Sequence, residues 1–246
     1  MVRFGRWKEI LQIPFPRYPL LMLYRSASLH FARGLALANT GHIEMAITEA
    51  SLFDELRLKP SAEMRILHNN TVSALFAVDA PMLRGEIAYK SGKYSEAFAL
   101  LRKAVELQDG LNYDEPWGKM QPTRHALGGL LCEQGYYDEG EEVFRKDLKF
   151  HPNNPFGLIG LLSCLRGRLK VSSGSPSCCK KKTQDNSSPH SKLKSVSVCG
   201  EDRVNMEAEV EQLQAALVEQ RKTSWADFPI DVPCQCCTQT LADNKS

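Results

Sequence analysis

The sequence contains no run of about 18 apolar residues, and so it predicts no membrane-spanning helix. Its charged first ten residues lack the apolar stretch of a secretion signal. Eight cysteines in a chain without such a signal indicate reduced thiols rather than a disulfide framework. The net charge of +2 gives no reason to expect a nucleic-acid partner. We therefore expect a cytoplasmic protein that binds neither a membrane nor a nucleic acid.

The sequence also lacks the short motifs of common enzymes. It has no G-x-S-x-G nucleophile elbow, no phosphate-binding loop and no dinucleotide fingerprint. Carboxylates are plentiful, but mixed-charge helix faces normally carry them, and no pair of carboxylates stands out. We expect no catalytic residue, no cofactor and no enzymatic activity.

The sequence does contain a helix–turn–helix pattern. From Pro122, apolar residues recur at helical spacing on both sides of a break at Gly135. A small residue stands at Gly128, an aromatic residue at Phe144 and a proline at Pro152. This unit of about 34 residues resembles the tetratricopeptide repeat. In that family the small residue fills the tightest helix contact, the aromatic residue packs from the second helix, and the proline closes the unit.

The same marks recur along the chain, as Gly34 with Gly41, Gly85 with Gly92, and a further repeat start at Gly160. The spacing between the repeats is uneven, and extra segments lie near 58–72 and 109–121. The resemblance implies an all-α fold, a tetratricopeptide-repeat helical solenoid built from antiparallel helix pairs.

The composition changes beyond residue 169, and we expect the repeats to occupy residues 1–169. Residues 170–200 are rich in serine and lysine and contain no aromatic residue, which predicts a disordered insert. This insert serves either as a spacer or as a basic interaction segment. An amphipathic helix over 201–222 would complete the last repeat, with a surface or coiled-coil helix as the alternative. Residues 223–246 form a cysteine-containing tail.

Two features disturb the regular pattern. The first residues resemble the glycine turn and second helix of a repeat, so we expect a chain that lacks N-terminal repeats or whose edge a partner covers. Pro81 lies within the helical pattern of residues 72–91. Because an interior proline costs about 3 kcal/mol, it predicts a break or bend near Asp79.

Several motifs resemble a particular group of tetratricopeptide proteins that is common in bacteria. The group carries YDEP followed by tryptophan, here residues 113–117, and then P-x-R before a repeat, here ending at Arg124. Its members also end in Asp-Val-Pro with close cysteines, here residues 231–237. The resemblance implies the fold and no well-established enzymatic activity.

The resemblance further implies which residues face the concave groove, because certain positions of each first helix do so in this family. These positions are Phe31, Leu35 and Asn39, then Glu86, Tyr89 and Lys90, then His125, Cys132 and Glu133. They mix charged and apolar groups, as the binding of a peptide or a partner helix requires. We expect a non-enzymatic interaction scaffold that binds a protein partner in this groove, with its oligomeric state left open.

The loop Tyr113, Asp114, Glu115, Pro116 and Trp117 has two interpretations. It either faces a ligand, or it folds over the groove and is held there, with Trp117 burying apolar area. In the second case Asp114 or Glu115 would pair with Arg124. We include Tyr113, Asp114, Glu115, Trp117 and Arg124 among the expected partner-binding residues.

An alternative function is a small-molecule or metal-binding module, in which this loop closes a polar pocket. His30, Glu86 and His125, with Cys234 and Cys236, offer the ligand types that zinc prefers. The spacing is poor for chelation, because Cys236 and its neighbours face no second pair of ligands. We therefore expect no metal, and we expect Cys132 and Cys164 to be small core residues.

Overall fold

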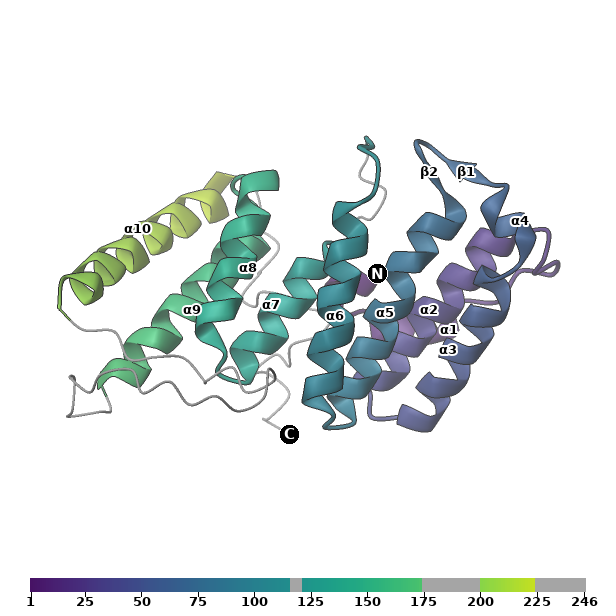
Figure 1. Ribbon diagram of the computed structural model, residues 1–246, viewed down its shortest axis with the longest axis horizontal. Helices are drawn as coiled ribbons and strands as arrows, with labels where there is room; N and C mark the ends of the chain where they lie inside the picture. The colour runs from purple at the N-terminus through teal and green to yellow at the C-terminus, as the bar shows by residue number, and fades with distance from the viewer. Residues whose placement is uncertain (116–120, 174–199, 224–246) are drawn as a thin grey trace, which may run out of the picture. The chain divides into compact units, whose positions relative to one another are not determined.

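The computed structural model describes residues 1–115, 121–173 and 200–223, which form helices and one short hairpin (Figure 1). They belong to two compact units, Met1–Thr123 and the unit that begins at Arg124, which we describe separately. The first unit contains a 3-10 turn Val2–Phe4, α1 Trp7–Gln12, α2 Leu23–Asn39, α3 Ile43–Arg57, α4 Pro60–Glu63, β1 Ile66–Leu67, β2 Asn70–Thr71, α5 Val72–Lys90 and α6 Tyr94–Asp109. Then follow α7 Thr123–Glu133, α8 Tyr137–Phe150, α9 Pro155–Ser173 and α10 Glu201–Thr223.

Consecutive helices of each unit pack side by side, as α2 does with α3, α5 with α6, and α8 with α9 (Figure 1). The predicted all-α fold of tetratricopeptide-like helix pairs is confirmed. The core of the first unit is aromatic and aliphatic, with Leu35, Phe53, Phe76 and Leu83 almost completely buried. In the second unit Phe144, Leu161 and Leu165 form a comparable core.

The turns inside the helix pairs share one geometry. Gly92 has a φ of +76°, in the left-handed region that only glycine adopts readily. The amide of the next residue, Lys93, donates to the Ala88 carbonyl at 2.9 Å, which closes a Schellman-type helix end. The turns between α2 and α3 and between α7 and α8 have the equivalent glycine and the equivalent hydrogen bond. The predicted turn glycines therefore end the first helix of each pair.

The four small-residue positions are places where helices almost touch. A Cβ atom at Gly34 would lie 2.9 Å from Leu83, and one at Gly85 would lie 2.9 Å from Leu101. A Cβ at Gly128 would lie 2.7 Å from the Phe144 ring. Gly160 approaches the same ring from α9. Contacts this short mean that a Cβ added at any of these positions would have to displace the neighbouring side chain, so packing favours glycine there.

Helix α5 continues without a break from Val72 to Lys90, although Pro81 lies inside it. The break predicted near Asp79 is therefore wrong, and a bend there stays a prediction. The Thr71 hydroxyl caps the start of α5 by accepting from the Ala74 amide at 3.1 Å. Buried residues occur on both sides of the proline, including Phe76 and Leu83, and their burial offsets the cost of the proline.

Helix α10 corresponds closely to the helix predicted over 201–222. Met206 and Leu217 are buried, and they pack with the partly buried Val210 and Leu213 against residues of α8 and α9. Helix α9 extends to Ser173, beyond the expected end of the repeats at residue 169. Most of the expected insert and the cysteine-containing tail lie outside the described residues. None of the described helices is long and apolar enough to cross a membrane.

The contact at Gly128 makes a direct prediction about stability. We expect Gly128→Ala to lower the free energy of unfolding by about 1–3 kcal/mol, because the added methyl group must displace the Phe144 ring. Gly110→Ala is the matched control, since Gly110 has a φ of −83° and its nearest neighbour would be 3.5 Å from a Cβ. Urea unfolding monitored by circular dichroism measures both, and equal midpoints for the two variants would contradict the packing role of Gly128.

Candidate functional site

The predicted groove residues of the first unit meet where α2 and α5 lie side by side. The Asn39 side-chain amide on α2 donates to the Glu86 carboxylate on α5 at 3.2 Å. The same amide donates to the Leu35 carbonyl one helical turn earlier, at 3.0 Å. Glu86 is completely buried. The structure thus brings the half-buried Asn39 and the buried Glu86 together as one polar pair, on the first helices of two successive helix pairs.

Tyr89 and Lys90 follow Glu86 on the same helix but differ in their surroundings. Tyr89 is buried, and its ring lies against the rings of Tyr94 at 5.0 Å and Phe98 at 6.1 Å on α6. Lys90 is half-buried, and its ammonium group lies 6.0 Å from the Tyr89 ring centroid. Tyr89 therefore packs the α5–α6 pair together, while Lys90 places a positive charge beside the Tyr89 ring.

The predicted groove residues of the second unit do not share one environment. His125 is 3% exposed, and its Nε2 atom lies 2.8 Å from the Asp147 carboxylate of α8. The His125 ring also stacks on Phe156 of α9, with a centroid distance of 5.9 Å. Glu133, at the other end of α7, is exposed. His125 thus joins α7 to α8 and α9 in the interior, whereas Glu133 lies at the surface.

The two extra segments between the repeats meet in a cluster of asparagine side chains. The Asn70 side chain accepts from the Asn112 amide at 2.8 Å and donates to the Asn112 carbonyl at 3.0 Å. The Asn112 side chain in turn donates to the Asn69 carbonyl at 2.8 Å. These reciprocal bonds imitate a short strand pairing. We refer to Asn69, Asn70, Asn112 and Asp114 as the asparagine clasp.

Asp114 of the YDEP motif is the acidic member of this clasp. It is 3% exposed, and its carboxylate accepts from the Asn70 side chain at 3.3 Å and the Asn69 amide at 3.4 Å. The Asn69 side chain also donates to the Tyr113 carbonyl at 2.9 Å. The Asp114 side chain therefore holds the loop to the hairpin β1–β2, which favours the structural interpretation for this residue.

The other residues of this loop and its predicted partner are placed differently. Tyr113 and Glu115 are exposed, and the Tyr113 hydroxyl donates to the Glu115 carboxylate, which raises the pKa of Tyr113. Arg124 is buried in the second unit, with its guanidinium 5.4 Å from the Phe150 ring centroid. Pairing of Arg124 with Asp114 or Glu115 stays a prediction, because these residues belong to the two separately described units. Trp117 lies outside the described residues.

A charged cluster near α1 was not predicted from the sequence. The Glu49 carboxylate lies 2.6 Å from His30 Nδ1 and accepts from Arg33 Nε at 2.7 Å. Burial raises the pKa of Glu49, but the bonds from His30 and Arg33 outweigh it and hold that pKa below its usual value. Arg33 also donates to the Leu11 carbonyl at 2.9 Å, which joins α1 to α2. His30, a candidate metal ligand, is thus paired with a carboxylate.

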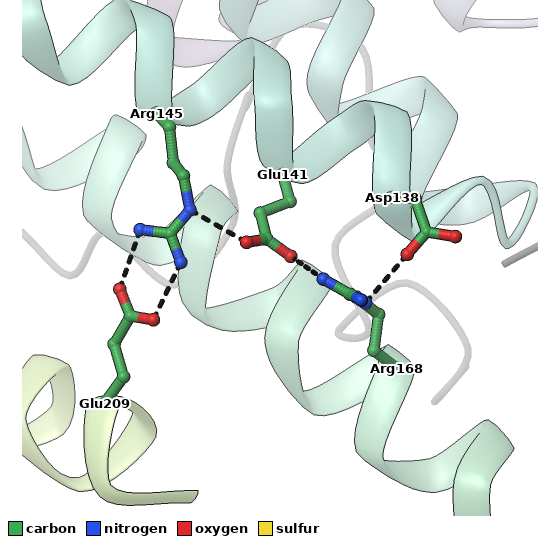
Figure 2. Close-up of polar contacts among 5 residues, drawn as sticks. All are labelled: Asp138, Glu141, Arg145, Arg168 and Glu209. Atoms are coloured by element: carbon green, nitrogen blue, oxygen red, sulfur yellow. Dashed lines mark hydrogen bonds and ion pairs between the residues drawn. The ribbon is translucent and has the colours of Figure 1, made fainter. Parts of the chain in front are cut away.

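A second charged network joins α10 to α8 and α9 (Figure 2). Arg145 donates to both carboxylate oxygens of Glu209, at 2.8 and 2.7 Å, and to Glu141 at 2.8 Å. The bond to Glu209 is the main reason that the pKa of Arg145 is raised. Arg168 of α9 pairs with Glu141 and lies 2.7 Å from Asp138. A bidentate pair fixes direction as well as distance, so this network sets the position of α10 on the second unit.

Cys132 of α7 and Cys164 of α9 are hydrogen-bonded neighbours. Cys164 is fully buried and Cys132 is half-buried, so the prediction of core residues holds for Cys164. A hydrogen bond with the Cys164 thiol lowers the pKa of Cys132, while the same bond and burial raise the pKa of Cys164. No group of three or more His, Cys, Asp or Glu residues suitable for a metal occurs within the described part of the chain. Cys234 and Cys236 are outside it.

The described residues of the first unit also form a cavity of about 220 Å³ between α3 and α5. Its floor includes Ala50 and Ile87, and charged side chains at its edge include Arg84 and Lys93. With 3.6 residues per turn, the cavity residues of α5 lie on the face opposite to Glu86. The cavity is therefore separate from the Asn39–Glu86 pair.

A comparison with known protein families finds one match, which covers part of the chain. The family described as "Tetratricopeptide repeat" matches residues 80–110, which cover the second half of α5 and all of α6. This match supports a tetratricopeptide-repeat protein. No curated protein and no solved structure matches the chain.

The asparagine clasp makes a prediction about the stability of the hairpin and loop. We expect Asn70→Ala to lower the free energy of unfolding by about 1–3 kcal/mol, because it removes one partner of the buried Asp114 carboxylate and both bonds to the Asn112 backbone. Hydrogen exchange at residues 66–71 and 111–114 should accelerate together. Gln12→Ala, at an exposed position on α1, is the control. If exchange at 111–114 stayed at the wild-type rate in Asn70→Ala, the clasp would not hold this loop.

Proposed function

We propose that this chain is a non-enzymatic scaffold that binds a peptide segment of a protein partner on the face formed by α2 and α5. Two facts support the proposal. The helix pair α5–α6 matches the tetratricopeptide repeat, and such repeats usually bind protein partners. The first helices α2 and α5 pack against one another, and the family uses first helices for its groove.

The main support for the proposal is the polar pair formed by the half-buried Asn39 and the buried Glu86. Burying an amide and a carboxylate costs free energy that apolar side chains at the same positions would not cost. The half-buried Asn39 side chain is the member of the pair that a peptide can reach, and Glu86 holds it in place from α5. An asparagine amide is also a group that binds the N–H and C=O groups of a peptide backbone.

Lys90 adds a charge preference to this face. It is half-buried on the helical turn after Glu86, close to the Tyr89 ring. A lysine in this position favours a peptide with an acidic side chain or a terminal carboxylate next to the segment that contacts Asn39. The proposed partner is thus a peptide that combines backbone contacts with at least one negative charge.

Other predicted site residues contribute less to this proposal. Asp114 and His125 each have close protein partners in the folded chain, Asn70 and Asp147. We propose structural roles for these two residues, and we propose that Tyr113 contacts the partner only at the margin of the binding surface. Glu133 belongs to the second unit, and its contact with a partner stays a prediction. We propose the cytoplasm as the place where the scaffold acts.

A displayed library of random peptides tests this proposal on the intact chain. We expect selection to enrich acidic peptides, and we expect Lys90→Glu to weaken their binding by about tenfold or more in fluorescence anisotropy, because the charge contact becomes repulsive. Lys103→Glu, at an exposed position of α6, is the charge-matched control and should bind as the wild type does. The proposal fails if no peptide is enriched, or if the enriched peptides bind Lys90→Glu with unchanged affinity.

A further inference from the structure

Large apolar side chains protrude from two neighbouring segments of the first unit. In the segment before α2, Tyr18 is 58% exposed, Leu20 63% and Leu21 71%. After α4, Met64 is 82% exposed, and Ile66, the first residue of β1, is 72% exposed. We refer to these five residues as the apolar tip. Apolar side chains this exposed on two neighbouring segments mark an interaction surface.

The two segments are joined to one another and held in place. The Arg65 guanidinium, between Met64 and Ile66 in sequence, donates to the Leu21 carbonyl at 3.1 Å. The buried Ser26 hydroxyl bonds to the Pro19 carbonyl at 3.0 Å. Figure 1 shows the chain before α2, in purple, near α4. The two segments of the apolar tip are therefore linked through the Arg65–Leu21 bond.

The segments that carry the apolar tip contain more positive than negative charge. Residues 13–25 contain two arginines, Arg17 and Arg25, and no acidic residue. Residues 58–67 contain Lys59, Arg65 and a single acid, Glu63. The Arg17 guanidinium lies 5.4 Å from the Tyr18 ring centroid, so cation and aromatic ring are presented together. Exposed apolar groups next to cations complement a partner whose outer layer is negatively charged and whose interior is apolar.

We propose that the apolar tip inserts into the headgroup region of an anionic lipid membrane, with the surrounding cations against the lipid phosphates and carboxylates. Such insertion requires side chains that project outward, and the tip has this shape. A peptide would need a groove, and the cavity of the first unit, between α3 and α5, includes no residue of the tip. Burial of Leu20, Leu21, Met64 and Ile66 supplies the apolar contribution, and each nearby Lys or Arg adds to the attraction.

This association is peripheral and requires no membrane-spanning helix. The proposed association adds a membrane partner that the composition alone did not predict. The cations and the apolar side chains of the tip are distributed over two segments that α2 and α3 separate in the sequence. The association is also independent of the peptide face, since the residues of the apolar tip are distinct from Asn39, Glu86 and Lys90. The chain could therefore bind a peptide and a lipid surface at the same time.

Sedimentation with lipid vesicles tests the proposal on the intact chain. We expect vesicles of phosphatidylcholine and phosphatidylserine to bind about tenfold or more tightly than vesicles of phosphatidylcholine alone, and we expect added salt to weaken the binding. Leu20→Glu with Leu21→Glu should reduce binding to the anionic vesicles by about tenfold or more. Met45→Glu is the control, because Met45 is 54% exposed on α3 and lies outside the apolar tip.

Three outcomes would overturn the proposal. The wild-type chain could remain in the supernatant with anionic vesicles. The double variant, with an unchanged circular dichroism spectrum, could bind them as tightly as Met45→Glu does. Analytical ultracentrifugation could show a dimer that the double variant dissociates, with no vesicle binding by either form, in which case the tip joins two copies of the chain.

Discussion

The close approach of helices at four glycines is the constraint on which the rest of the structure depends. At Gly34 and Gly85 a leucine from a neighbouring helix occupies the space that a Cβ would need. At Gly128 and Gly160 a single ring, that of Phe144, occupies this space for both α7 and α9. Helices this close to each other cannot slide or rotate without a collision. The glycines therefore fix which face of each first helix is turned toward its neighbours.

That fixed rotation explains where the polar residues lie. Glu86 directly follows Gly85, so the contact of Gly85 with Leu101 also orients Glu86 toward α2 and Asn39. In the second unit His125 lies one turn before Gly128, and the packing that buries Gly128 on Phe144 also brings His125 to Asp147. The two units thus place their polar pairs at different positions relative to the glycine, with an amide–carboxylate pair just after Gly85 in one and a histidine–aspartate pair just before Gly128 in the other.

The sequence predicted the features that depend on local spacing. The glycine marks, the turns and the helix over 201–222 follow from periodicity, and the structure has them. The asparagine clasp could not be predicted, because Asn70 and Asn112 are separated by 42 residues and asparagines in loops are common. The unbroken helix at Pro81 depends on burial along both sides of α5, which the local pattern does not report. The burial of Tyr89 depends similarly on Tyr94 and Phe98 of the next helix.

The central claim is that the face shared by α2 and α5 is the binding surface for a peptide. Hydrogen-exchange mass spectrometry of the intact chain, with and without a peptide selected on it, tests this claim most directly. We expect slower backbone amide hydrogen exchange at residues 35–39 and 86–90 when the peptide is bound, and unchanged exchange in α10. Protection confined to the residues around the α3–α5 cavity, such as Ser51 and Arg84, would place the peptide on the opposite face of α5. That result would contradict binding on the face shared by α2 and α5.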